Sequence, residues 1–239
     1  MTNYEALEED DQEVIARLQR IRRYKIVVTI ITVILGFALG ISLLLLIIGA
    51  STCSIDSLGN QWEGFGPDGQ LLYLVNFNTG IMQANYVSYI STAGGNGGTR
   101  KTFLNDPYGL DTLTTNDYTN TGYDRGHLVP NADYGDVTYY MPNVVPMTPN
   151  FNRGIWNQVE QEIRANYAGK LVYKGCRYTE DFTYSQLGKR LYIPQGCHYV
   201  VFDSSDLDFP TPGHILDHGY YEMTEGSQKQ PILPSWIRC

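Results

Sequence analysis

Two polar runs in the middle of the chain carry side chains whose types and spacing suit phosphoryl chemistry. The first is Tyr123-Asp124-Arg125-Gly126-His127, and the second extends from Asn152 to Arg164. Hydrolysis of a phosphodiester requires an activated water, neutralisation of the charge that develops on the phosphoryl oxygens, and a stabilised leaving oxygen. A base, fixed cations and a metal ligand would meet these needs, and the two runs contain candidates for each.

His127 is the candidate general base. An imidazole with an ordinary pKa near 6.5 is mostly neutral at pH 7 and can accept a proton. Asp124 or a backbone carbonyl could hold its other ring nitrogen. Arg125 and Arg164 supply permanent positive charge for phosphate oxygens. A single His beside a glycine is more often structural, so the expectation depends on the joint pattern.

Asn152 offers a neutral, hard amide oxygen, which suits a magnesium ion that keeps most of its waters. Glu160 lies eight residues later, about 12 Å along a helix axis, which is too far to grip the same ion. We therefore expect Glu160 to hold metal-bound waters. Taken alone, Asn152 is equally consistent with a helix N-cap, and Glu160 with Arg164 four residues on is consistent with a surface ion pair.

The two runs together resemble the sugar-nonspecific DNA/RNA endonucleases of the Serratia nuclease type, which have a ββα-metal site. Asp124-Arg125-Gly126-His127 resembles their DRGH motif, and Asn143-Val-Val-Pro146 resembles their Asn-x-x-Pro element. The second run matches the N-x3-W-x3-E-x3-R spacing of that family through Asn152, Trp156, Glu160 and Arg164.

The resemblance implies a role for each of these residues. His127 would be the base, Asn152 the direct ligand of Mg²⁺ (or of Mn²⁺ or another divalent cation), and Glu160 the organiser of its waters. Arg125 and Arg164 would contact phosphate, with Asp124 and Asn143 in support. It also implies cleavage of DNA and RNA without sequence preference.

Two departures from the family pattern concern substrate contacts. Met147 stands where the family usually has Gln after the Asn-x-x-Pro proline. The second departure is a lysine that is common after the Ile-Pro strand and is replaced here near Tyr199. A further substrate-binding arginine of the family would fall near Arg100 and Lys101. We therefore expect activity with altered substrate contacts.

The elements around these runs predict an α+β fold. Residues 71–77 and 84–90 alternate as strands around a turn at Asn78-Thr79-Gly80, which predicts a β-hairpin. Residues 153–166 have the apolar stripe of a helix, and 170–178 and 191–202 read as strands. The proline-bearing tail reads as mostly irregular. The family resemblance adds a central antiparallel sheet flanked by helices.

Residues 26–50 form an uncharged apolar stretch of the length of a transmembrane helix. Lys and Arg cluster before it, which predicts a type II protein with residues 1–25 in the cytoplasm and 51–239 on the extracellular or lumenal side. A cleaved signal peptide is the alternative, but its apolar core would be shorter. Gly36 and Gly40 form a GxxxG spacing that permits homodimer packing in lipid.

The four cysteines all follow the apolar stretch, on the side where disulfides form. Three connectivities are possible. We favour Cys176–Cys197, which would join neighbouring strands, and Cys53–Cys239, which would join the ends of the domain. A structural zinc site is disfavoured because no two cysteines have CxxC spacing.

The net charge of −8 argues against a nonspecific nucleic-acid coat protein, although it leaves room for a locally positive cleft. Two other functions remain open. One is a catalytically silent nuclease fold that serves as a surface binding or structural protein, which the acidic composition favours. The other is a ribonuclease that acts through the 2′-hydroxyl and needs no metal.

Overall fold

The computed structural model describes residues 54–55, 60–95, 97, 102–205, 207 and 214–238. The expected membrane segment 26–50, the basic pair Arg100 and Lys101, and the cysteines Cys53 and Cys239 lie outside these ranges. Within them, no helix combines the length and apolarity needed to cross a bilayer.

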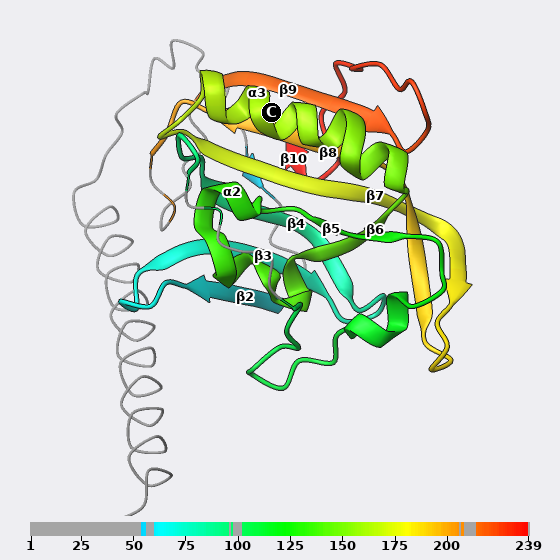
Figure 1. The fold of residues 1–239 in the computed structure, drawn as a ribbon. Helices are drawn as coiled ribbons and strands as arrows, with labels where there is room; N and C mark the ends of the chain where they lie inside the picture. Colours follow the sequence, from blue (N-terminus) through cyan, green and yellow to red (C-terminus); the bar gives the residue numbers. More distant parts are fainter. Residues whose placement is uncertain are drawn as a thin grey trace, which may run out of the picture. The chain divides into compact units, whose positions relative to one another are not determined.

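A six-stranded antiparallel sheet forms the centre of the domain (Figure 1), in the spatial order β2-β3-β4-β7-β8-β9. Its strands are β2 (Asn60–Phe65), β3 (Leu71–Asn78), β4 (Gln83–Ile90), β7 (Leu171–Tyr184), β8 (Arg190–Phe202) and β9 (Ile215–Glu222). The predicted β3–β4 hairpin is confirmed, with Val75 opposite Val87 in the antiparallel register.

The two faces of the sheet carry separate apolar clusters, because successive side chains of a strand point to opposite faces. One face, with Val75, Val87, Val172 and Val201, packs against the helical side of the domain. The opposite face, with Tyr173, Val200 and Phe202, packs against the C-terminal segment around Trp236. Both faces are therefore covered, and the first face supports the segment that contains the two polar runs.

The segment with the two polar runs, Asp124 to Asn166, crosses the first face as two strands followed by a helix. Strand β5 (Asp124–His127) pairs antiparallel with β6 (Val144–Met147), and a π-helix, η4 (Phe151–Trp156), continues into α3 (Asn157–Asn166). Short helices connect β5 and β6: α2 (Asn131–Tyr134), η2 (Gly135–Tyr139) and η3 (Met141–Asn143). The 3-10 helix η1 (Thr115–Tyr118) precedes β5, and the short strands β1 (Ser54–Ile55) and β10 (Ile237–Arg238) pair with each other.

Three boundaries differ from those expected. The tail was predicted to be mostly irregular, but Ile215–Glu222 adds strand β9 to the edge of the sheet. Strand β7 runs to Tyr184, six residues beyond its predicted end at Tyr178. The helix expected from Arg153 begins at Phe151 and opens with a π-helical turn, a rare geometry that is frequent at functional sites.

Candidate active site

A polar cavity of about 830 Å³ lies where β5 meets the first turn of η4. Four of the residues predicted from the sequence line it: Asp124, Arg125, His127 and Asn152. The structure thus brings together the candidate base, one candidate phosphate contact and the candidate metal ligand, although Asn152 is 25 residues from His127 in the chain. The remaining lining residues are Phe103, Tyr118, Thr119, Tyr123, Asn131, Tyr139 and Arg153.

The absence of a side chain at Gly126 lets strand β5 pack closely against the Met147 side chain of β6. A Cβ atom at this position would come within 2.4 Å of the Met147 sulfur, which is buried on β6. Met147 is the residue that replaces the family's usual Gln, and it covers Gly126 rather than lining the cavity. A side chain at position 126 would therefore require the buried Met147 side chain to move.

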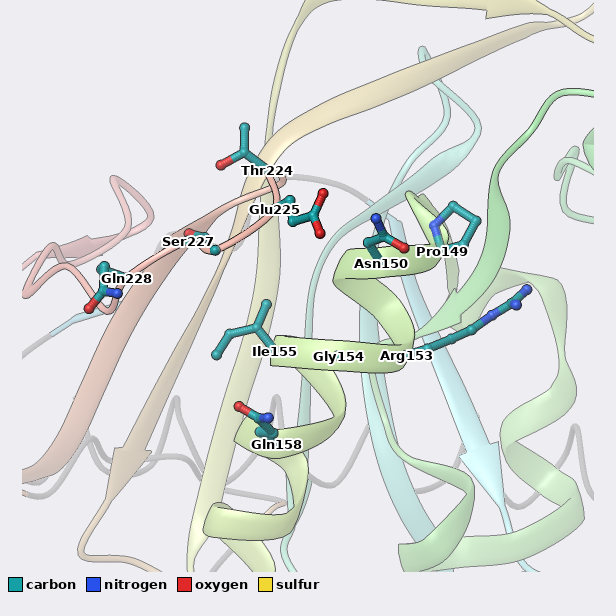
Figure 2. A pocket seen from close by; sticks show the side chains of 11 residues that line it. Pro149, Asn150, Arg153, Gly154, Ile155, Gln158, Thr224, Glu225, Ser227 and Gln228 are labelled. Carbon is teal, nitrogen blue, oxygen red and sulfur yellow. The ribbon is translucent and has the colours of Figure 1, made fainter.

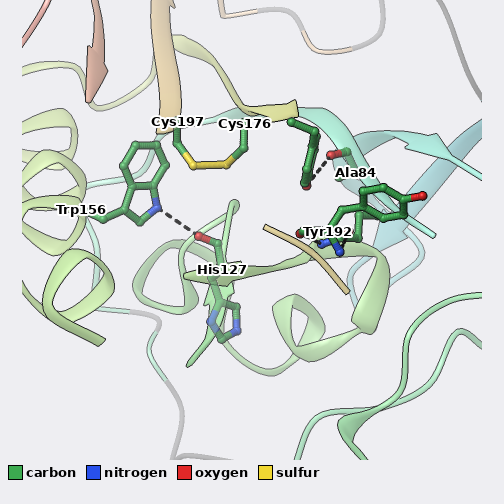
Figure 3. The surroundings of a disulfide bond; sticks show 8 residues. Ala84, His127, Trp156, Cys176, Tyr192 and Cys197 are labelled. Carbon is green, nitrogen blue, oxygen red and sulfur yellow. Dashed lines mark hydrogen bonds between the residues drawn. A yellow bond between two sulfur atoms is a disulfide. The ribbon is translucent and has the colours of Figure 1, made fainter. Parts of the chain in front are cut away.

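Two aromatic rings contact the imidazole of His127, and a hydrogen bond from Trp156 fixes its backbone carbonyl. The Tyr139 ring stands edge-on at 4.9 Å between centroids, and the Phe103 ring lies at 5.2 Å. The indole nitrogen of Trp156 donates a hydrogen bond of 3.2 Å to the carbonyl oxygen of His127 (Figure 3). Trp156 is fully buried, so this bond ties β5 to the end of η4 through the core.

Asp124 joins the same two elements on the cavity side. Its Oδ2 accepts a hydrogen bond from Asn152 Nδ2 at 3.0 Å and another from Arg153 Nε at 2.8 Å. Its Oδ1 accepts from Arg153 Nη2 at 2.6 Å, which completes a bidentate ion pair. Asp124 therefore orients the amide of Asn152, a role that the sequence did not indicate for it.

The donor set of the cavity fits a hydrated magnesium ion. With its nitrogen committed to Asp124, the Asn152 amide presents its oxygen as the coordinating atom, and amide and carboxylate oxygens are the hard ligands that Mg²⁺ prefers. In the part of the chain that is described, no three His, Cys, Asp or Glu side chains gather into a cluster that could hold a metal. An ion at Asn152 would accordingly keep most of its coordination as water.

Three residues of the cavity wall each have a buried donor atom without an acceptor among the described residues. These atoms are Arg125 Nε, Tyr118 Oη and Asn131 Nδ2. The Arg125 guanidinium is partly fixed by Phe103, whose ring centroid lies 5.1 Å away, and by a 3.4 Å bond from Nη1 to the Thr115 carbonyl. These three donor atoms have almost no exposed surface, so they lie behind the wall of the cavity.

Glu160 and Arg164 belong to α3 and do not line this cavity. Their side chains point under the helix, where each pairs with a buried residue of opposite charge. Glu160 Oε1 lies 3.3 Å from Nζ of Lys174, whose side chain is 0% exposed on β7. Arg164 Nη1 lies 3.6 Å from Oδ2 of the buried Asp133. Burial raises the pKa of Glu160 and lowers the pKa of Lys174, and each charge opposes the shift in its partner. The predicted water-organising and phosphate-binding roles of the two α3 residues remain predictions.

Asn143 and the disulfide support the site from within the protein. The Asn143 amide donates to the carbonyls of Val129 and Thr138 and accepts from the Val129 nitrogen, which fixes the chain after DRGH. Cys176 and Cys197 form a disulfide between opposite positions of β7 and β8, as predicted. Figure 3 shows it beside the Trp156 indole.

A second hollow of about 560 Å³ lies on the other side of η4, between this helix and residues 224–228 (Figure 2). Ile155 and Gln158 face that loop in Figure 2, whereas the Arg153 side chain extends away from it. Arg153 lines both hollows. The second hollow contains no histidine, so we assign the chemistry to the cavity at His127.

Sequence reasoning missed several residues of the cavity. Arg153 adjoins Asn152 and could have been suspected as a further cation. Tyr118 and Asn131 gave no signal, because their place in the cavity depends on how η1 and α2 fold around β5. Phe103 comes from a segment far upstream.

Comparisons with known proteins agree with this geometry. The sequence profile of the family described as DNA/RNA non-specific endonuclease matches residues 72–231, more than half of the chain. A nuclease from Nostoc sp. is 32% identical over 124 residues, which cover 46% of this chain and 43% of that protein. Human mitochondrial endonuclease G is 38% identical over 58 residues, covering 22% of this chain and 20% of that protein.

The matched segments thus span less than half the length of these curated relatives. A solved structure described as the EndoG/EndoGI complex aligns with 67% of this chain and 73% of that chain, at 20% identity and a TM-score of 0.48. The extent of the profile match, which includes both polar runs, decides the assignment: the chain belongs to the DNA/RNA non-specific endonuclease family.

Proposed function

We propose that the protein is a metal-dependent endonuclease that hydrolyses phosphodiester bonds of DNA and RNA without sequence preference. The observation that carries the proposal is the one polar cavity that His127, Arg125 and Asn152 line together. An imidazole, a guanidinium and an oriented amide oxygen in one polar cavity are the groups that a phosphodiester and its attacking water require.

In the proposed mechanism His127 removes a proton from the attacking water. A positioned general base of this kind contributes about 10²- to 10⁴-fold to the rate. Arg125 binds a non-bridging phosphate oxygen, and its contacts with Phe103 and Thr115 keep the guanidinium in place before substrate arrives. Tyr118 and Asn131 line the same cavity.

Asn152 holds the divalent cation through its amide oxygen, and Asp124 keeps the amide in that orientation. When bound, Mg²⁺ or a similar ion supplies charge stabilisation for the phosphoryl and leaving oxygens. Glu160 and Arg164 pair with buried charges beneath α3, and these pairs hold the continuous helix that begins with η4 and Asn152. The family resemblance further assigns Glu160 a contact to metal-bound water and Arg164 a contact to phosphate.

The direct test is cleavage of plasmid DNA and of structured RNA by residues 51–239 in the presence of Mg²⁺. The His127→Ala variant should lose activity, and a chelator should abolish cleavage by the wild-type protein. Equal cleavage by wild type and His127→Ala would overturn the proposal. Binding of substrate and metal without turnover would instead support the silent surface protein, and chelator-resistant cleavage of RNA alone would support a 2′-hydroxyl mechanism.

We also propose that residues 26–50 anchor the protein in a membrane as a type II protein, with the nuclease domain on the extracellular or lumenal side. The uncharged length of this stretch and the basic residues before it support this topology. Protease protection of intact vesicles tests it: residues 51–239 should be protected when the lumen is closed. The GxxxG pair Gly36 and Gly40 is the proposed contact of a homodimer, which Gly36→Leu should weaken.

A further inference from the structure

We propose that Lys174 is a positioning residue of the nuclease site, which fixes the indole of Trp156 and, through it, the backbone of His127. The proposal rests on the function proposed above. Lys174 is the fourth residue of β7 and lies opposite Val87 of β4 and Tyr199 of β8. Its side chain is 0% exposed, and it reaches from the centre of the sheet toward the helix that carries Asn152.

The ammonium of Lys174 lies against two aromatic rings and one carboxylate. Its Nζ is 5.1 Å from the Trp156 ring centroid, 5.6 Å from that of Tyr89, and 3.3 Å from Glu160 Oε1. Cation–π contacts of this length are attractive, and they gain strength where water is excluded. The ammonium therefore fixes the indole from one side, and Glu160 keeps the ammonium there.

The other edge of the same indole contacts the catalytic strand. Trp156 Nε1 donates to the carbonyl oxygen of His127, as Figure 3 shows. A displacement of the indole would therefore move the backbone of the proposed base relative to Asn152, which lies four residues before Trp156 on the same helix. Loss of about 1 Å of alignment between reacting groups is enough to cost an enzyme substantial rate.

Stability alone does not require an ion pair between Lys174 and Glu160 at this place in the core. Replacement of buried ion pairs by well-packed apolar side chains is often neutral or stabilising. The sheet face around Lys174 is otherwise lined by Val87, Val172 and Tyr199, so packing alone does not require a lysine. The lysine is explained if its charge orders the indole and the strand beyond it.

The experiment compares wild type with Lys174→Met, which keeps the length of the side chain and removes its charge. We expect kcat to fall about 10- to 100-fold, as is typical for groups that support a catalytic residue from behind. KM should change less, because Arg125 and the other substrate donors keep their contacts. The ring signals of His127 in ¹H–¹⁵N NMR spectra, assigned by their loss in His127→Ala, should shift or broaden.

A second pair of variants keeps the test informative if Lys174→Met folds poorly. Glu160→Gln with Lys174→Met leaves no unpaired charge in the core, and Glu160→Gln alone is its reference. The proposal expects the double variant to shift the His127 signals beyond those of Glu160→Gln, because the indole has lost its cation. Identical His127 signals in these two variants, or a folded Lys174→Met with wild-type kcat and signals, would overturn it.

The two readouts separate this inference from the proposed function. If the wild-type protein fails to cleave nucleic acid, the proposed function is wrong. The NMR comparison still reports whether Lys174 acts on His127, since it needs neither substrate nor turnover.

Discussion

Asn152 on η4 donates a hydrogen bond of 3.0 Å from its amide nitrogen to Oδ2 of Asp124 on β5. This bond connects the DRGH strand to η4, the helix of the proposed metal ligand, and determines which atom of the amide would face a cation. The same carboxylate holds Arg153, so one side chain orders a neutral ligand and a cation at the mouth of the cavity. The finding gives the aspartate of the DRGH motif a specific task.

Asp124→Ala should weaken metal use. Without the acceptor, the Asn152 amide is free to rotate, and we expect the Mg²⁺ concentration for half-maximal cleavage to rise by about 10- to 100-fold. Calorimetric titration of Mg²⁺ into the protein provides a second measurement that does not require turnover. An unchanged Mg²⁺ requirement in a folded Asp124→Ala variant would contradict the assignment.

Arg153→Ala is the matched control for this prediction. It removes the ion pair with Asp124 but leaves the Asp124–Asn152 bond in place. The Arg153 side chain is 72% exposed, and exposed ion pairs contribute little because water and salt screen them. We therefore expect the Mg²⁺ requirement to stay near that of wild type, with any effect of Arg153 appearing in KM for nucleic acid.

The candidate site was predictable where its residues lie in short local patterns. His127 and Arg125 share one strand, and Asn152, Trp156 and Glu160 recur at helical spacing. Spacing alone could not reveal the partners of these residues. Lys174 and Asp133, which pair with Glu160 and Arg164, come from a strand and a helix that only the tertiary fold brings beneath α3.

The strands of the sheet could be predicted where their sequences have a strong apolar pattern. A strand that forms mainly because it pairs with a neighbour could not be predicted. The β3–β4 hairpin has long apolar alternation and was predicted within one residue at each boundary. Strand β9 contains Asp217, His218 and Gly219, which have weak β propensity. Its pairing with β8 and the 2.8 Å bond from Tyr199 to Asp217 outweigh that preference.

His198 should make the domain less stable in mild acid. It is 5% exposed, and burial lowers its pKa from 6.5 to about 4. The unfolded chain binds a proton at this residue between these values and the folded protein does not, so unfolding becomes more favourable as the pH falls from about 6.5 to about 4. The loss should approach about 3 kcal/mol at the acid end, because each pKa unit corresponds to about 1.4 kcal/mol.

Urea unfolding at several pH values between 7 and 4 measures this effect. His198→Gln should give a shallower loss of unfolding free energy with falling pH than wild type. Parallel profiles for wild type and His198→Gln would show that another group controls acid stability.

The Cys176–Cys197 disulfide should stabilise the domain without taking part in catalysis. The two cysteines are 21 residues apart, and closing a loop of this size stabilises a protein by about 2–4 kcal/mol. Cys176→Ala with Cys197→Ala should lower the free energy of unfolding by that amount. The folded variant should keep most of its cleavage activity, because neither sulfur lines the cavity. A wild-type unfolding midpoint in the double variant would refute the stabilising role.

Cys53 and Cys239 should form the second disulfide. Strands β1 and β10 pair antiparallel, with Ser54 opposite Arg238 and Ile55 opposite Ile237. In the sequence, Cys53 directly precedes β1 and Cys239 directly follows β10, and directly opposed residues of an antiparallel pair have Cβ atoms about 4.5–5.5 Å apart. A small adjustment brings this separation into the range of a disulfide. The two cysteines lie outside the described residues, so the pairing is a prediction from their neighbours.

Peptide mapping of the oxidised protein by mass spectrometry decides between the connectivities. Proteolysis without reduction should yield one linked fragment that contains Cys53 and Cys239 and another that contains Cys176 and Cys197. Cys53→Ser should leave Cys239 as the single thiol that reacts with an alkylating reagent in the unfolded, unreduced protein. Recovery of alkylated Cys53 and Cys239 from the wild-type protein would show that the ends of the domain are joined by the β1–β10 ladder alone.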